Sequence, residues 1–311
     1  MHYTGTIWRP PYEAGALLLE VTAGCTHHRC KFCTLYGDLP FSFRMSPLED
    51  VESDLREAQM RCTDPLGALS ARLQGLPETV QVRRVFLTGA NPFVLKAGRL
   101  LEIAGLIRRY LPSVETIGCF GRITDVGLKS GAELTALREA GFDGLTLGIE
   151  TGDDAALAFM NKGYGAEDIL RQCRRLDEAG IRYSFFYLAG ISGAGKGTAG
   201  ARATVELCNQ LHPMRIGVNM LTVYPDSELY REIQRGNWQE AGELEKYREM
   251  RVLVDGLRIP VEFAALGASN AVPLWGKLPE ERESLLGALD GILSGVEEGR
   301  LREYRRSLPH L

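Results

Sequence analysis

Three cysteines within nine residues are the side chains best suited to chemistry. Four residues separate Cys25 from Cys30, and two separate Cys30 from Cys33. They follow an apolar run at residues 16–21, so the pattern predicts a loop at the end of a strand. The next cysteine along the chain is Cys62. A [4Fe–4S] cube held by only three thiolates keeps one iron open for a ligand that is not protein.

A zinc site that uses His27 or His28 with the three cysteines is the main alternative. Structural zinc sites usually pair two short ligand motifs across a long spacer. Here all three cysteines lie in one loop, and the histidines between them would have to fold back toward the metal. The pattern therefore favours an iron–sulfur cluster, with the two histidines as surrounding donors or solvated side chains.

Composition limits the class of protein. The chain has 311 residues, which suffices for one large α/β domain or two small ones. Its net charge of −4 offers no basic field, so no nucleic-acid partner is expected. The charged C-terminal segment is interpreted as a solvated helix face. Its arginines are Arg300, Arg302, Arg305 and Arg306.

Location and redox state follow from what the sequence contains. No apolar run reaches membrane-spanning length, and no charged-then-apolar signal opens the chain, so a cytoplasmic protein without membrane contact is expected. Seven cysteines, three of them clustered, do not resemble a disulfide framework. The dispersed cysteines are expected to be small buried side chains, although Cys119, with Arg122, leaves a predicted strand and could face a cavity.

Strand and helix patterns alternate along the chain. Strands are expected at about 16–22, 84–88, 115–120, 144–149, 182–188 and 215–223. Helices are expected at about 46–61, 97–110, 130–140, 153–160, 165–179 and 201–211, with one short helix possible within 62–82. Such alternation implies parallel strands joined by right-handed crossovers. The order alone does not separate an open sheet from a barrel. Beyond residue 225 the pattern predicts helices at about 226–235, 239–254 and 279–304, with an edge strand at 261–265.

The cysteine loop resembles that of the radical SAM superfamily. That signature has three cysteines, with three residues and then two between them, and an aromatic residue before the last. Phe32 stands in the aromatic place, whereas the extra residue before Cys30 makes this a variant loop. The resemblance implies a small member with an α/β fold, a partial (β/α)6 TIM-type barrel with a C-terminal helical extension. We expect the core at residues 1–225 and the helical cap at 226–311.

The resemblance also implies residues that bind S-adenosylmethionine (SAM). In the superfamily the second strand ends in a glycine-rich turn whose backbone binds the methionyl amino group. Gly89, Ala90 and Asn91 stand there, and Asn91 takes the usual acidic position. A Glu at the end of the fourth strand contacts the SAM side, and a cation twelve residues on pairs with its carboxylate. Glu150 and Lys162 fit these two places.

A glycine-rich loop at residues 190–198 leaves two interpretations open. Its sequence nearly matches the phosphate-binding P-loop motif, but Gly197 stands where the Mg²⁺-binding Ser or Thr belongs. The resemblance instead assigns this loop to the neighbourhood of SAM's adenosine. Backbone N–H groups in such a nest serve either ligand.

The implied activity is reductive cleavage of SAM to a 5′-deoxyadenosyl radical that acts on an unidentified small substrate. The cofactors would be an oxygen-sensitive [4Fe–4S] cluster and SAM, and the reductant a flavodoxin or ferredoxin. One alternative is a different SAM cleavage or methyl transfer. Another is a metal-binding module with a P-loop-like nucleotide site.

Overall fold

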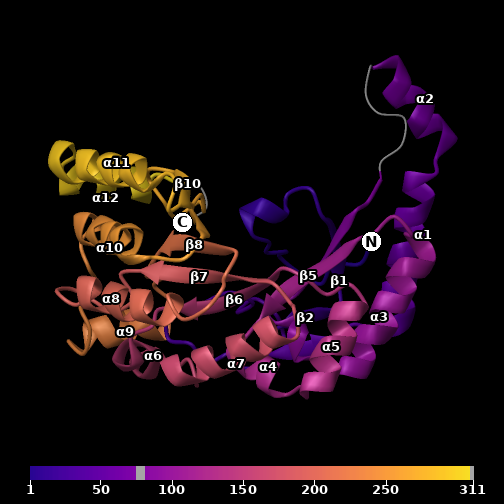
Figure 1. Ribbon diagram of the computed structural model, residues 1–311, viewed down its shortest axis with the longest axis horizontal. Helices are drawn as coiled ribbons and strands as arrows, with labels where there is room; N and C mark the ends of the chain where they lie inside the picture. The colour runs from indigo at the N-terminus through magenta and orange to yellow at the C-terminus, as the bar shows by residue number, and fades with distance from the viewer. Residues whose placement is uncertain (75–80, 309–311) are drawn as a thin grey trace. The chain divides into compact units, whose positions relative to one another are not determined.

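The computed structural model describes residues 1–74 and 81–308 (Figure 1). These residues divide into two compact units. The first unit comprises residues 1–26, 36–145 and 179–181, and the second comprises 27–35, 146–178 and 182–311. The predicted core at 1–225 and cap at 226–311 stay predictions.

The first unit is built on three parallel strands in the order β1-β4-β5. These strands are β1 (Leu17–Glu20), β4 (Arg84–Thr88) and β5 (Thr116–Gly121). The apolar run of β4 is fully buried, as expected of a parallel strand that is covered on both faces. A small antiparallel pair, β2 (Thr22–Gly24) with β3 (Phe43–Met45), flanks the cysteine loop in sequence.

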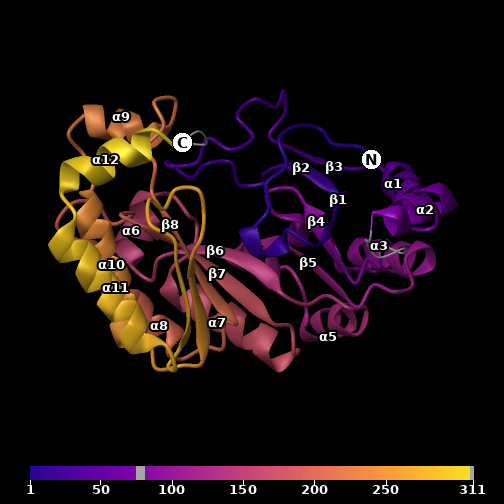
Figure 2. The same cartoon turned by 90° about the horizontal axis from the view of Figure 1, so that it is seen from above.

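Among the described residues of this unit, five α-helices accompany these strands. They are α1 (Leu48–Cys62), α2 (Pro65–Leu73), α3 (Ala97–Tyr110), α4 (Ile123–Gly127) and α5 (Gly131–Glu139), with short 3-10 turns at Pro11–Glu13 and Pro92–Val94. Helix α3 packs against both α1 and α5 (Figure 2). It buries Leu100, Ile103, Ala104 and Ile107, which recur at helical spacing. The rest of the weakly patterned stretch, residues 75–80, lies outside the described residues.

The second unit contains strands in the order β6-β7-β8-β9-β10. The first three are β6 (Leu145–Glu150), β7 (Tyr183–Ala189) and β8 (Arg215–Met220). Strands β7 and β8 pair in parallel. The helices are α6 (Asp154–Phe159), α7 (Ala166–Glu178), α8 (Gly197–Cys208), α9 (Glu228–Gln234), α10 (Glu243–Gly256), α11 (Arg282–Gly295) and α12 (Glu298–Arg306).

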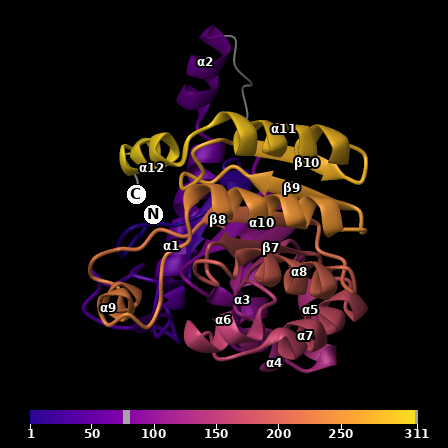
Figure 3. The same cartoon turned by 90° about the vertical axis from the view of Figure 1, so that its left-hand side faces the viewer.

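The C-terminal part differs in detail from the prediction. The strand expected at 261–265 is β9 (Val261–Ala265), but it is not an edge strand, because β10 (Leu274–Leu278) pairs with it in antiparallel register. The single helix expected at 279–304 is two helices, since Val296 adopts an extended backbone conformation between α11 and α12. Helices α10 and α11 lie side by side over this part of the unit (Figure 3). No helix of the described residues combines the length and apolar character needed to cross a membrane.

Candidate functional site

The three clustered cysteines are divided between the two units. Cys25 follows β2 in the first unit, where its N–H donates to the Ser42 carbonyl at 2.7 Å. Cys30 and Cys33 lie in the second unit, and the Cys33 N–H donates to the Cys30 carbonyl at 3.1 Å. Within residues 1–74 and 81–308, no three metal-binding side chains converge on one point. Thiolates that bind three different irons of one cube do not require such convergence.

The loop that carries Cys30 is bonded to the turn between α6 and α7. The Lys31 N–H donates to the Met160 carbonyl at 3.1 Å, and the Asn161 amide donates to the Arg29 carbonyl at 3.0 Å. His27 Nε2 lies 2.6 Å from the Asn161 carbonyl, and must carry the hydrogen because a carbonyl only accepts. This nitrogen therefore does not serve as a zinc ligand, in line with the interpretation of His27 as a surrounding donor.

Lys31 also ties the cysteine loop to α9. Its carbonyl accepts the Leu229 N–H at 2.7 Å, and its Nζ lies 3.2 Å from Glu232 Oε1. The same ammonium lies 4.1 Å from the centre of the Phe159 ring, a cation–π contact. The cysteine loop is thus hydrogen-bonded both to the turn between α6 and α7 and to α9.

Lys162 and Glu150 form a largely buried ion pair. Lys162 Nζ lies 2.9 Å from Glu150 Oε1, so the pairing that the family resemblance implies is present. Burial acts to lower the Lys162 pKa, but Glu150, Tyr164 and Cys30 together outweigh it and raise that pKa above its usual value. Lys162 therefore keeps its positive charge beside Cys30. A Cβ at Gly148 would lie 2.6 Å from the Glu150 carboxylate, so glycine there makes room for the pair.

Glu150 is the last residue of β6 and has a φ of 65°, a left-handed conformation that is unusual for a glutamate. The aromatic residue of the signature lies nearby: the Phe32 ring centre is 5.8 Å from Lys162 Nζ. Phe32 also packs against an apolar cluster of the same unit, which we call the loop cluster. Its members are Met160, Ile191, Leu221 and Leu229. The second unit therefore brings together four predicted site residues: Cys30, Phe32, Glu150 and Lys162.

The predicted glycine turn lies in the first unit, directly after β4. Gly89 has a φ of +126°, and a Cβ there would lie 2.0 Å from Thr22 Oγ1. Ala90 donates its N–H to the Gly24 carbonyl at 3.3 Å. The buried hydroxyls of Thr22 and Thr88 have no hydrogen-bond partner among the described residues. Buried polar groups normally have partners, so these two hydroxyls suit a site that holds a further molecule.

Asn91 is fully buried and uses its side chain within the protein. Its amide donates to Thr26 Oγ1 at 2.8 Å and to Asp125 Oδ2 at 3.1 Å. Burial raises the pKa of Asp125, although hydrogen bonds from the Arg122 N–H and from Asn91 oppose that shift. Because Thr26 follows Cys25, the Asn91 side chain positions the start of the cysteine loop.

The glycine-rich loop after β7 donates N–H groups to carboxylates of helix α10. Gly190 N donates to both oxygens of Glu249 at 3.0 Å, and Gly195 N donates to Glu245 Oε1 at 2.6 Å. A Cβ at Gly197 would lie 2.2 Å from Glu249 Oε1. Carboxylates of α10 therefore occupy the space that a P-loop reserves for phosphate, which argues against a nucleoside triphosphate site.

One expectation for a dispersed cysteine is confirmed, one interpretation is wrong, and one residue was missed. Cys119 is fully buried, as expected of a dispersed cysteine, and burial raises its pKa, so this thiol does not suit the substrate-facing alternative. Arg305 is buried and bonded to Glu243, so the solvated-face interpretation is wrong for this residue. The missed residue is Asn161, which bonds the cysteine loop. Its φ of 57° is a left-handed conformation that asparagine tolerates better than most residues. Its position directly before Lys162-Gly163 could have indicated a turn there.

The family model for the radical SAM superfamily matches residues 19–194, more than half of the chain. No curated protein sequence matches this chain.

Three solved structures share the fold. The methyltransferase TsrM from Kitasatospora setae, with cobalamin and a [4Fe–4S] cluster bound, is 19% identical over 71% of this chain and 39% of its own (TM-score 0.52). Coproporphyrinogen III oxidase HemN from Escherichia coli, a radical SAM enzyme, is 14% identical over 77% and 51% (TM-score 0.51). Elp3 from the archaeon Methanocaldococcus infernus is 13% identical over 89% and 63% (TM-score 0.53).

These matches are likenesses of fold, and the chain spans between 39% and 63% of the three structures' lengths. They confirm the predicted α/β fold of the partial-barrel type. The family implies SAM-dependent radical chemistry, with a [4Fe–4S] cluster and SAM as its cofactors. On the match of the family model over more than half its length, the chain belongs to the radical SAM superfamily.

Proposed function

We propose that the protein holds a [4Fe–4S] cluster through Cys25, Cys30 and Cys33 and reductively cleaves SAM. The resulting 5′-deoxyadenosyl radical would act on a small substrate that is not identified. One observation carries the proposal: the loop with Cys30 is hydrogen-bonded to the turn that presents the buried cation of Lys162.

The residues present fit the proposed cofactors. Cysteine thiolates are the usual ligands of iron–sulfur clusters, and three of them leave one iron open. The Lys162 charge beside Cys30 suits a site whose ligands are thiolates. The unpartnered hydroxyls of Thr22 and Thr88 beside the Gly89 turn suit a site for a polar ligand. When bound, the cluster would supply the single electron that splits the S–C5′ bond of SAM.

Each predicted residue has a role in this proposal. The backbone at Gly89 and Ala90 binds the methionyl amino group, while the side chain of Asn91 holds Thr26 in place. Glu150 contacts the SAM side of the site, and Lys162 fixes the orientation of its carboxylate. Phe32 and the loop cluster exclude water from this part of the site. A cytoplasmic flavodoxin or ferredoxin supplies the electron.

Anaerobic reconstitution with iron and sulfide tests the proposal. A reduced cluster should give an EPR signal that changes on addition of SAM, and turnover should release methionine and 5′-deoxyadenosine. Methylthioadenosine would instead indicate cleavage of another bond, and S-adenosylhomocysteine would indicate methyl transfer. A reduced cluster whose EPR signal is unchanged by added SAM would contradict the proposal.

Single cysteine variants identify the cluster ligands. Cys25→Ala, Cys30→Ala and Cys33→Ala should each lose the cluster and the SAM-dependent EPR change, because each removes one of three thiolates. Iron and sulfide content per chain provides the measurement. Cys62→Ala is the matched control and should keep the wild-type content. Retention of a full cluster by any of the first three variants would remove that cysteine from the ligand set.

A further inference from the structure

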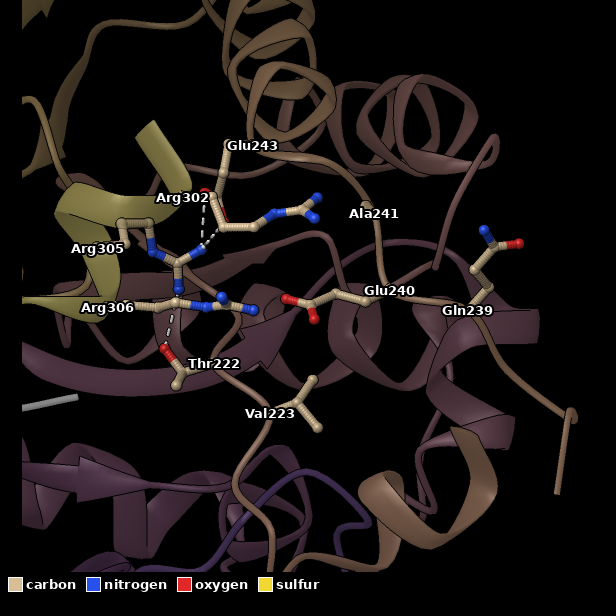
Figure 4. A pocket seen from close by; sticks show the side chains of 9 residues that line it. All are labelled: Thr222, Val223, Gln239, Glu240, Ala241, Glu243, Arg302, Arg305 and Arg306. Atoms are coloured by element: carbon tan, nitrogen blue, oxygen red, sulfur yellow. Dashed lines mark hydrogen bonds and ion pairs between the residues drawn. The ribbon is translucent and has the colours of Figure 1, made fainter. Parts of the chain in front are cut away.

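A cavity of about 470 Å³ lies within the second unit, between the segment after β8, the start of α10 and helix α12 (Figure 4). Its volume falls within the usual range of small-molecule sites. Val223 and Ala241 contribute apolar surface, while three arginines and two glutamates contribute charge. Its lining therefore carries a net charge of +1.

The two carboxylates of the lining already have cationic partners. Arg305 Nη1 donates to both carboxylate oxygens of Glu243 at 2.8 Å. The fully buried Lys246 lies 3.2 Å from Glu240 and 3.4 Å from Glu243. These charges compensate one another, so the glutamates do not neutralise the other arginines of the lining.

Arg302 and Arg306 are those other arginines. They lie four residues apart on α12, and Figure 4 shows both side chains extending into the same space, with Glu240 facing them. Arg302 bonds Glu298 on its own helix at 3.1 Å. The side chain of Arg306 makes no hydrogen bond or ion pair with any residue in 1–74 or 81–308. Like charges at this helical spacing repel one another, so their juxtaposition costs stability unless an anion lies between them.

A buried donor at the same cavity adds an independent observation. Arg305 Nε is inaccessible to solvent and has no acceptor among the described residues. The other nitrogens of Arg305 bond Glu243, the Leu221 carbonyl and Thr222 Oγ1. The favourable interaction of basic residues with a helix C-terminus explains why arginines stand in the last turn of α12. It does not explain why one is buried and two point into a cavity.

One residue of the cavity wall packs against the same apolar cluster as the cysteine loop. Val223 lines the cavity and packs against the loop cluster, which Phe32 also contacts. The cavity wall and the cysteine loop therefore each place a side chain against one apolar cluster of the second unit.

We propose that this cavity binds an oxyanion group, a carboxylate or a phosphate, of the substrate, with Arg302 and Arg306 as its ligands. Arg305, held by Glu243 and Thr222, forms the buried part of the wall. As a statement about substrate class, this inference rests on the proposed radical SAM function. Guanidinium groups bind both oxyanions through paired N–H donors.

Calorimetric titration of the reconstituted protein at fixed ionic strength tests the inference, with malonate, inorganic phosphate and the uncharged malonamide as probes. Malonate or phosphate should bind at least about tenfold more tightly than malonamide, since hydrogen bonds between charged groups are stronger than those to a neutral amide. Tighter malonate binding would indicate a carboxylate substrate, and tighter phosphate binding a phosphate ester. Equal affinity for malonamide would overturn the inference.

Arg306→Gln and Arg302→Gln should each weaken oxyanion binding by about tenfold. Arg300→Gln is the matched control: this exposed residue of α12 does not line the cavity, and its variant should bind as the wild type does. If Arg300→Gln and Arg306→Gln lost oxyanion affinity equally, the binding would be a diffuse attraction to the charged surface, and the inference would be overturned.

Formation of 5′-deoxyadenosine, assayed on the same wild-type preparation, separates this inference from the proposed function. Oxyanion binding without SAM cleavage would support the cavity and overturn the proposed function. SAM cleavage without oxyanion binding would overturn the cavity alone.

Discussion

The buried ammonium of Lys162 depends on the Glu150 carboxylate for charge compensation. Lys162→Met should destabilise the protein by about 3 kcal/mol, because removing one partner of a buried pair leaves the other charge uncompensated. Chemical denaturation measures this loss. Glu150→Gln should cost a similar amount.

The double variant Glu150→Gln/Lys162→Met separates stability from ligand binding. It should recover most of the lost stability, since neither buried charge remains. It should not recover SAM affinity if the pair belongs to the SAM site. Recovery of both properties would show that the pair is purely structural.

Gly89 is the position where the turn depends most on glycine. Gly89→Ala should destabilise the protein by at least about 2 kcal/mol, because alanine resists a φ of +126° and its Cβ would meet Thr22. Thr22→Ala should not rescue it, since the Thr22 carbonyl lies 2.6 Å from the same Cβ. Gly98→Ala in α3, with open space around it, is the control and should be neutral or stabilising by up to about 1 kcal/mol.

At the scale of elements, α10 holds the glycine-rich loop through Glu249. Burial raises the pKa of Glu249 to about 7, although hydrogen bonds from the Gly190 N–H and the Tyr187 hydroxyl oppose the shift. The folded state therefore binds this proton more tightly than the unfolded chain, whose carboxyl has an ordinary pKa of 4.5. The stability contributed by Glu249 is complete below pH 4.5 and is lost as the pH rises to about 7.

Glu249→Gln should remove this pH dependence. The wild type should lose about 3 kcal/mol of unfolding free energy from this group between pH 4.5 and pH 8, while the variant should lose less. Denaturation curves across that range measure the difference. Identical pH profiles for the two proteins would mean that Glu249 has no raised pKa in the folded state.

The elements themselves were largely predictable, with one instructive exception. Continuous apolar runs and helical periodicity indicated strands such as β4 and helices such as α3. Strand β10 was missed, although Leu274, Gly276 and Leu278 alternate inward with exposed Trp275 and Lys277. Prolines on both sides of this short run made it resemble a loop. Its pairing with β9 decides its conformation.

At the scale of the whole molecule, ligand binding should appear as stability. With the cluster in place, SAM at a hundred times its dissociation constant should add about 2.7 kcal/mol to the unfolding free energy. Thermal unfolding under anaerobic conditions, with and without SAM, measures this gain. The Cys30→Ala protein should show none, because it lacks the cluster that binds SAM. An equal gain in that variant would mean that SAM binds elsewhere.

Two properties could be determined from the sequence because they are local to the chain. The spacing of Cys25, Cys30 and Cys33 depends on nine consecutive residues, and so does the chemistry that three neighbouring thiolates allow. The alternation of strands and helices depends on periodicities within short windows. These features predicted the superfamily, the fold class and the ion-pair partners twelve residues apart.

Only the tertiary structure decided which polar groups have partners. His27 bonds Asn161, 134 residues away, and Arg305 bonds Glu243, 62 residues away. The carboxylate of Glu249 accepts the Gly190 N–H in a glycine-rich loop whose sequence resembles a phosphate-binding loop. Burial and charge compensation depend on side chains brought together from distant segments, and no local pattern specifies them.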